Sequence, residues 1–125
     1  MAANDLHTLT ARLRQFAAER DWDQFHSPKN LSMALAAEAA ELLEHFQWLT
    51  EEQSANLPQD KRDAVELELA DIFNYLLRLA DKLDIDLAAA ADRKIQINEQ
   101  KYPAARVRGK AMKYDEYGEF DGDGG

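Results

Sequence analysis

Apolar residues recur at spacings of three and four along most of the chain, which is the period of an amphipathic α-helix. The pattern breaks at Pro28, Pro58 and Pro103 and again between residues 84 and 86. Ser27 before Pro28 is typical of a helix start, with serine as the N-cap and proline in the first turn. No alternation typical of a β-strand reaches a useful length. We therefore expect an all-α, four-helix bundle-like domain with helices over residues 5–20, 28–49, 60–83 and 86–102.

The segments between these helices are short. Residues 21–27 form an aromatic loop, and a polar linker surrounds Pro58. Glycine is nearly absent before Gly109 and then clusters near the end of the sequence, so residues 104–125 have the composition of a tail. We predict one domain over residues 1–117 and a loose, acidic, glycine-rich tail over residues 118–125.

Composition narrows the possible functions. The 125 residues include 24 acidic and 15 basic side chains, for a net charge of −9, and no cysteine. Disulfides, thiol nucleophiles and cysteine-ligated zinc are therefore excluded. The negative charge argues against binding to nucleic acid or anionic membranes, and no apolar run approaches the roughly 20 residues that span a bilayer. We expect a cytoplasmic protein, which could still bind an anionic substrate through divalent metal ions.

Two pairs of acids occupy informative positions on the helices. On a helical wheel, Glu38 falls near the middle of the apolar stripe of the second helix and Glu41 at its edge. Glu68 and Asp71 lie on the flank of the apolar stripe of the third helix, close to Tyr75. Burying unpaired carboxylates is costly, and Mg²⁺ would offset both the burial and their mutual repulsion. This placement predicts a carboxylate metal site between two helices.

An alternative is that these acids form buried salt bridges with basic residues of the later helices, namely Arg78, Lys82 or Lys94. A ferritin-like di-iron site is disfavoured because the sequence contains no Glu-x-x-His pair. Phosphate-binding loops of the G-x-x-x-x-G-K-[ST] type are also absent from the sequence.

Aromatic residues bracket the second helix, with Trp22 before it and Trp48 near its end. Lys94, Asn98 and Tyr102 follow one another at intervals of four and share one face of the last helix. Together they offer surfaces for stacking, an amide for a polar ring edge and a cation for phosphate, although core packing and a solvated face would also explain them. His26 lies in the aromatic loop, where it contacts a ligand, serves in packing or is exposed to solvent.

Six blocks in order resemble the all-α MazG-like nucleoside triphosphate pyrophosphohydrolases, and most closely their dCTP pyrophosphatase branch. The resemblance covers residues 6–117. The blocks are ERDWDQFHSPKN at 19–30, EAAE at 38–41, FQW at 46–48, ELAD at 68–71, the Lys94, Asn98 and Tyr102 series, and Pro103 after it.

The resemblance implies a helical homo-oligomer, commonly a tetramer built as a dimer of dimers. It implies Mg²⁺-dependent hydrolysis of a nucleoside triphosphate, dCTP in this branch, to the monophosphate and pyrophosphate, in cleansing of the nucleotide pool. We expect water activated by the metal to attack the α-phosphorus. Glu41 would act as the general base, because its position at the edge of the apolar stripe leaves it closest to a cleft. The metal ligands would be Glu38, Glu41, Glu68 and Asp71. The substrate-binding residues that match the family are Trp22, Trp48, Lys94, Asn98 and Tyr102. To these we add His26 of the aromatic loop and Tyr75 beside Glu68 as expected substrate contacts.

One position departs from this branch, because Leu13 stands where the branch often has a histidine, nine residues before Trp22. This change would affect which nucleobase the substrate pocket prefers. Two other functions remain open. A non-enzymatic interaction module would dock a partner through an apolar helix surface, and a carboxylate-bridged redox-metal bundle would hold iron or manganese.

Overall fold

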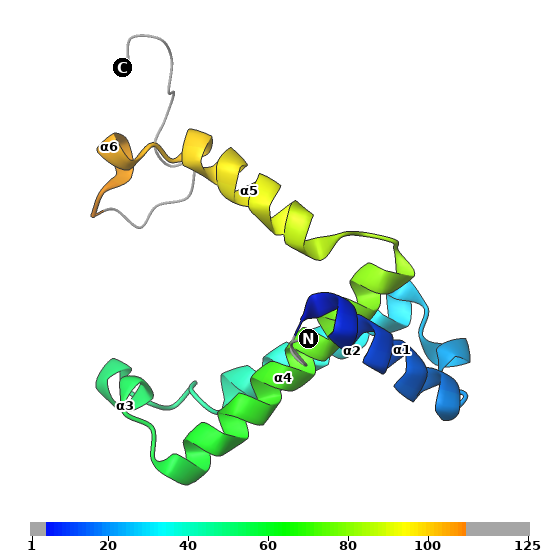
Figure 1. Cartoon of the computed structure of the whole chain (residues 1–125). Helices are drawn as coiled ribbons and strands as arrows, with labels where there is room; N and C mark the ends of the chain where they lie inside the picture. Colours follow the sequence, from blue (N-terminus) through cyan, green and yellow to red (C-terminus); the bar gives the residue numbers. More distant parts are fainter. Residues whose placement is uncertain (1–4, 110–125) are drawn as a thin grey trace. The chain divides into compact units, whose positions relative to one another are not determined.

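The computed structural model describes residues 5–109, and the regular structure in this range is entirely helical, which confirms the all-α prediction. The predicted division at residue 117 and the tail at 118–125 lie outside the described range. Figure 1 labels the elements. In chain order they are α1 (Leu6–Glu19), the 3₁₀ turn η1 (Asp23–Phe25), α2 (Pro28–Glu44), α3 (Glu51–Ala55), α4 (Gln59–Lys82), α5 (Leu87–Lys101) and α6 (Ala104–Val107).

The starts of the first two helices follow from local sequence. The Asp5 side chain accepts hydrogen bonds from the backbone N–H groups of His7 and Thr8, and so caps α1. The Ser27 hydroxyl accepts from the N–H of Asn30, and Pro28 occupies the first turn of α2. The predicted Ser27 cap is therefore confirmed.

The predicted end of the second helix is wrong, because α2 stops at Glu44 rather than near Leu49. Thr50 has an extended backbone (φ −72°, ψ 165°) and forms a capping box with Gln53, and this box starts the separate helix α3. An N-cap residue cannot continue the preceding helix, so the chain turns over residues 45–48. The short helix α6 likewise lies in a stretch that we predicted to be tail.

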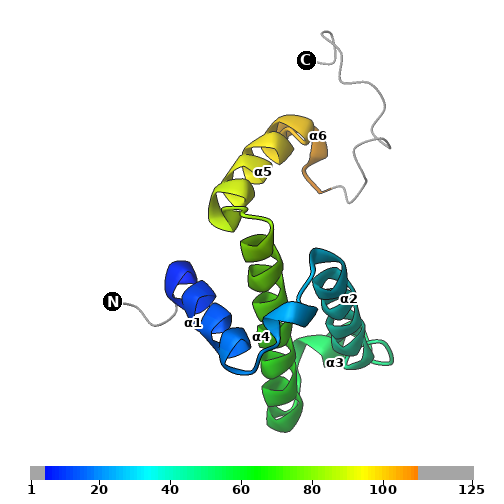
Figure 2. The same ribbon diagram turned by 90° about the vertical axis from the view of Figure 1, so that its right-hand side faces the viewer.

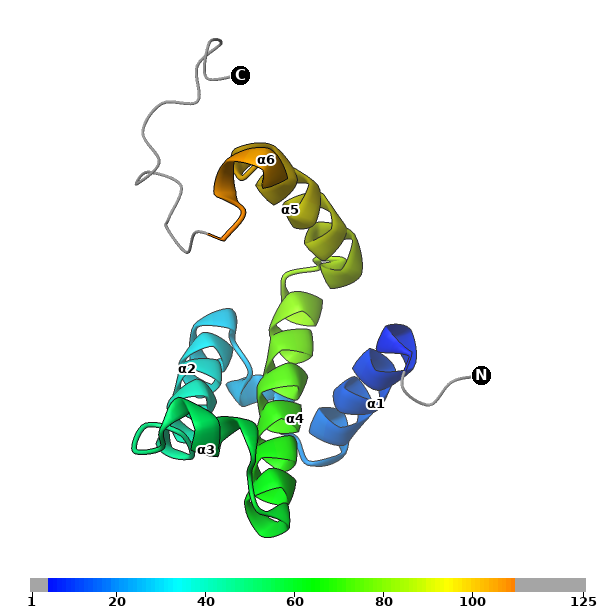
Figure 3. The ribbon, with the colours of Figure 1, turned by 90° about the vertical axis from the view of Figure 1, so that its left-hand side faces the viewer.

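The chain divides into two compact units, Met1–Asp86 and Leu87–Gly125. In the first unit α4 packs against both α2 and α1, which lie on opposite sides of it (Figure 2; Figure 3). Of the four long helices predicted, three thus belong to the first unit, and the fourth, α5, belongs to the second. None of the described helices is both long and apolar enough to cross a membrane.

The core of the first unit is small. Its buried apolar side chains are Ala17, Leu31, Val65, Leu77 and Ala80. Several large apolar side chains of α2 and α4 remain exposed, among them Leu43, Leu67 and Leu69, which are 58 %, 68 % and 51 % exposed. One copy of the chain therefore leaves much apolar helix surface uncovered.

Candidate functional site

Packing of α2 against α4 brings three carboxylates together. Glu38 and Glu41 lie one turn apart on α2, and Glu68 lies on α4. One carboxylate oxygen from each residue lies within 4.8 Å of the others, an arrangement that could hold a metal ion. We call these three residues the acidic cluster.

The acidic cluster has two oxygen atoms that are buried and unsatisfied. Oε2 of Glu38 and Oε2 of Glu68 are both buried and have no hydrogen-bond partner among the described residues. The Glu68 carboxyl raises the pKa of Glu38 above its ordinary value, because Glu38 can donate a hydrogen bond to Glu68 only when Glu38 is protonated. A hydrogen bond with Glu41 lowers the pKa of Glu38, and burial raises it further. The pKa of Glu41 is raised as well, mainly by Glu38. The cluster therefore favours binding of a positive charge.

The acidic cluster suits a hard divalent cation. Carboxylate oxygens are the ligands that Mg²⁺ and Ca²⁺ prefer, and a cation would satisfy both buried oxygens at once. The alternative of salt bridges to Arg78 or Lys82 is wrong, because these two cations pair instead with Asp23. Lys94, the third cation named in that alternative, belongs to the second unit, and a salt bridge to it stays a prediction. With Arg78 and Lys82 paired elsewhere, the three carboxylates suit a metal ion.

Asp71, the fourth predicted ligand, lies outside the acidic cluster as the side chains stand. It is exposed, one turn after Glu68 on α4, and it lines a neighbouring pocket. Asp71 therefore lies where the cluster and the pocket adjoin.

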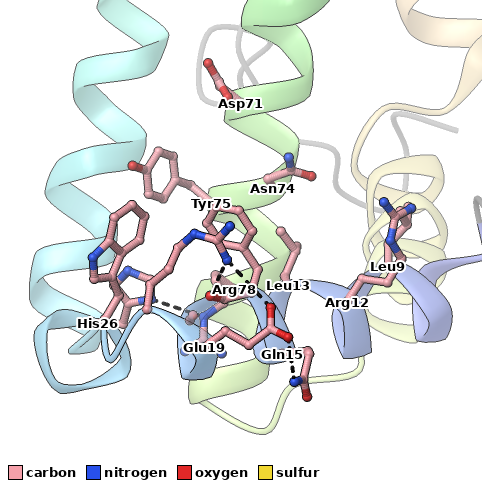
Figure 4. Close-up of a pocket in the computed structure, with 14 residues that line it drawn as sticks. Leu9, Arg12, Leu13, Gln15, Glu19, His26, Asp71, Asn74, Tyr75 and Arg78 are labelled. Carbon is pink, nitrogen blue, oxygen red and sulfur yellow. Dashed lines mark hydrogen bonds and ion pairs between the residues drawn. The ribbon is translucent and has the colours of Figure 1, made fainter.

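The pocket has a volume of about 720 Å³ and lies between α1, α4 and the segment around η1 (Figure 4). Three aromatic rings line it, those of Phe16, Trp22 and Tyr75. The rings of Phe16 and Trp22 meet edge to face, with centroids 5.7 Å apart, and the Arg20 guanidinium lies 3.7 Å from the centre of the Phe16 ring. Flat aromatic surfaces beside polar groups suit a planar, polar ligand such as a nucleobase.

The residues that we predicted to bind substrate divide into two groups. Trp22, His26 and Tyr75 line the pocket, as does Leu13. Trp48 does not line it and is 86 % exposed. The remaining three belong to the second unit: Lys94 and Asn98 are exposed on α5, and Tyr102, the residue after the end of α5, is half-buried.

Two residues that line the pocket, Arg78 and Phe16, were not among the predicted substrate-binding residues. Arg78 follows Tyr75 by three positions and Asp71 by seven, so the three share one face of α4 with Glu68. Phe16 belongs to the apolar pattern of α1, and it is nevertheless 45 % exposed and lines the pocket. One face of α4 therefore runs from the acidic cluster past Asp71 and Tyr75 to Arg78.

Comparison with known proteins agrees with this geometry. The model of the MazG-like family matches residues 33–117. The chain is 46 % identical over 102 residues to dCTP pyrophosphatase 1 from Mus musculus, and 44 % identical over 106 residues to the Homo sapiens protein of the same name. These matches cover 80 % and 82 % of this chain, but only 60 % and 61 % of the relatives. The chain thus spans about three-fifths of the length of these curated relatives.

A solved structure is similar over a larger share of its own length. It is a crystal structure of a pyrophosphatase from Archaeoglobus fulgidus, with a TM-score of 0.74 and 40 % sequence identity. The match covers 78 % of this chain and 91 % of that one. Together with the family model, which matches more than half of the sequence, this likeness shows that the chain belongs to the MazG-like family.

Proposed function

We propose that this chain is a Mg²⁺-dependent nucleoside triphosphate pyrophosphohydrolase that converts dCTP to dCMP and pyrophosphate, in cleansing of the nucleotide pool. The observation that carries the proposal is the pair of buried, unsatisfied oxygens of Glu38 and Glu68, next to a pocket lined by aromatic rings. The names of the mouse and human relatives support dCTP as the substrate.

The acidic cluster would hold the metal through Glu38, Glu68 and Glu41, with Asp71 joining them when substrate is present. Bound Mg²⁺ supplies charge neutralisation of the triphosphate and makes water a better nucleophile. Glu41 is the exposed member of the cluster and therefore the one best able to accept a proton from the attacking water. The bond that forms joins the water oxygen to the α-phosphorus, and the bond that breaks joins this phosphorus to the oxygen leading to the β-phosphorus.

The polar face of α4 would set the orientation of the substrate along the helix. Ten residues separate Glu68 from Arg78, and at 1.5 Å per residue this is about 15 Å along the helix. Triphosphate at the acidic cluster would thus place the base towards Tyr75, Trp22 and Phe16, which offer their rings for stacking. Asp71 lies between the two ends.

We also propose a homo-oligomer, a tetramer formed as a dimer of dimers. Its support is the exposed apolar surface of α2 and α4, together with Trp48, because large apolar side chains seldom remain so exposed on a free monomer. In the assembly Trp48, Lys94, Asn98 and Tyr102 would contact the substrate. We propose a cytoplasmic role as well. The net charge of −9 supports a function that involves neither nucleic acid nor an anionic membrane surface.

The test is release of pyrophosphate from each common dNTP and NTP, with Mg²⁺ and with EDTA. We expect Mg²⁺-dependent release that favours dCTP and is lost in Glu38→Gln. Glu44→Gln is the matched control, since Glu44 is an exposed acid on the same helix and lies outside the acidic cluster. Release from no nucleotide would refute the proposed activity and favour a non-enzymatic interaction module. Release that survives in Glu38→Gln would refute the metal assignment.

A further inference from the structure

Arg78 is the one charged side chain that is buried among the described residues, with only 5 % of it exposed. A buried guanidinium is costly unless its N–H donors find acceptors. One terminal nitrogen of Arg78 donates to Oδ1 of Asp23 at 2.6 Å, and the other donates to Oδ2 of Asp81 at 3.4 Å. Its Nε donates to Nδ1 of His26 at 3.2 Å. Arg78 therefore ties α4 to the segment that contains η1.

Two further cations complete this network. Lys82 lies 2.7 Å from Oδ1 of Asp23, and Arg14 donates to both oxygens of Asp81, at 2.7 and 3.1 Å. The two carboxylates are thus shared among three cations. Asp23 follows Trp22 directly in the chain, so the ion pair with Arg78 anchors the segment that carries Trp22.

The hydrogen bond to His26 determines where the imidazole proton lies. Arginine only donates, so Nδ1 of His26 must be the acceptor and a neutral ring must carry its proton on Nε2. Burial lowers the pKa of His26, and the charges of Arg78 and Lys82 lower it further, while Asp23 opposes them. His26 is therefore neutral near pH 7. Its Nε2 makes no hydrogen bond to another described residue, and the side chain lines the pocket (Figure 4).

We propose that Arg78 is a positioning residue for base selection: it holds His26 in the Nε2–H tautomer, and His26 presents this N–H to a hydrogen-bond acceptor on the bound nucleobase. The inference rests on the proposed function for the identity of the ligand. A nucleobase carbonyl or ring nitrogen is the acceptor class that fits, because Phe16, Trp22 and Tyr75 line the same pocket as His26 and their rings suit a planar group.

The tautomer can be measured without any substrate. In ¹⁵N-histidine NMR of the full chain, we expect His26 to be neutral at pH 7 with its proton on Nε2, and a His26→Phe variant assigns the signal among the three histidines. In Arg78→Met we expect a mixture of tautomers and a higher His26 pKa. Arg14→Met is the matched control, because Arg14 belongs to the same network but does not touch His26. A wild-type ring protonated on Nδ1, or an unchanged tautomer in Arg78→Met, would overturn the positioning role.

Kinetics test the second half of the inference. In His26→Phe we expect KM for dCTP to rise about threefold to tenfold, the factor that one neutral hydrogen bond contributes, with a smaller change in kcat. His26→Gln, which keeps an N–H donor at a similar reach, should recover part of this loss. An unchanged KM in His26→Phe would overturn the donor role.

These outcomes separate the inference from the proposed function. Absence of hydrolysis by the wild-type chain would refute the proposed function, whereas normal wild-type hydrolysis with an unchanged KM in His26→Phe would refute this inference alone. Neither the wild-type spectrum nor the His26 kinetics requires an Arg78 variant to fold.

Discussion

Replacing Glu38 by glutamine should make the protein more stable without metal and unable to gain stability from Mg²⁺. Oxygens of Glu38 and Glu68 lie within 4.8 Å of each other. At that separation two like charges repel by about 1 kcal/mol in water and by about 3.5 kcal/mol at an effective dielectric constant of 20. The new amide could also donate a hydrogen bond to the unsatisfied oxygen of Glu68. Since both residues are half-buried, we expect a gain of about 1–2 kcal/mol in the free energy of unfolding in EDTA.

Thermal unfolding followed by circular dichroism measures this effect, with all proteins at one concentration. For a domain of this size, each kcal/mol of added stability raises the Tm by roughly 3–6 °C. Adding Mg²⁺ should raise the Tm of the wild type, because a ligand that binds only the folded state stabilises it, and should leave Glu38→Gln nearly unchanged. Glu44→Gln should behave as the wild type does. A Glu38→Gln variant that is less stable in EDTA, or that gains as much from Mg²⁺ as the wild type, would refute the reasoning.

Three other predictions concern the pocket, the ion pairs and the assembly. Trp22→Ala should raise KM on the order of tenfold and weaken discrimination among bases, while stabilisation by Mg²⁺ survives; unchanged discrimination would count against the pocket. The hydrogen bond from Arg14 lowers the pKa of Asp81, although burial opposes this shift. The pair therefore stabilises the fold above a pH of about 4, the ordinary pKa of an aspartate. This stabilisation is lost as the pH falls through the lowered pKa of Asp81 in the folded state. Asp81→Asn should therefore be less stable than the wild type near neutral pH and lose less on acidification, and a parallel pH profile would contradict this. Light scattering at micromolar concentration should give an oligomer that Leu67→Glu weakens, and a wild-type monomer would contradict the proposed assembly.

Local signals made the helix starts predictable from sequence. Ser27 and Pro28 act within one turn of the helix that they begin, so no distant contact was needed to interpret them. The end of α2 was missed because Phe46 and Leu49 continue its apolar stripe beyond Glu44. The capping box of Thr50 and Gln53 was the competing local signal, and it prevails in the structure.

The acidic cluster could be predicted from the sequence for a related reason. Helical periodicity put Glu38 within the apolar stripe of one helix and Glu68 on the flank of the stripe of another, and such stripes pack against each other. Arg78 was not accessible in this way, because its partners His26 and Asp23 are 52 and 55 residues away in the chain. Only the packing of α4 against the segment around η1 adds these partners to Asp81, the acid on its own helix to which Arg78 also donates.

The most direct test of the proposed chemistry is the hydrolysis of dCTP with Mg²⁺ in ¹⁸O-labelled water, with the products resolved by mass spectrometry. Attack on the α-phosphorus predicts one labelled oxygen in dCMP and none in pyrophosphate. Label in pyrophosphate, or dCDP and phosphate as the products, would contradict the account.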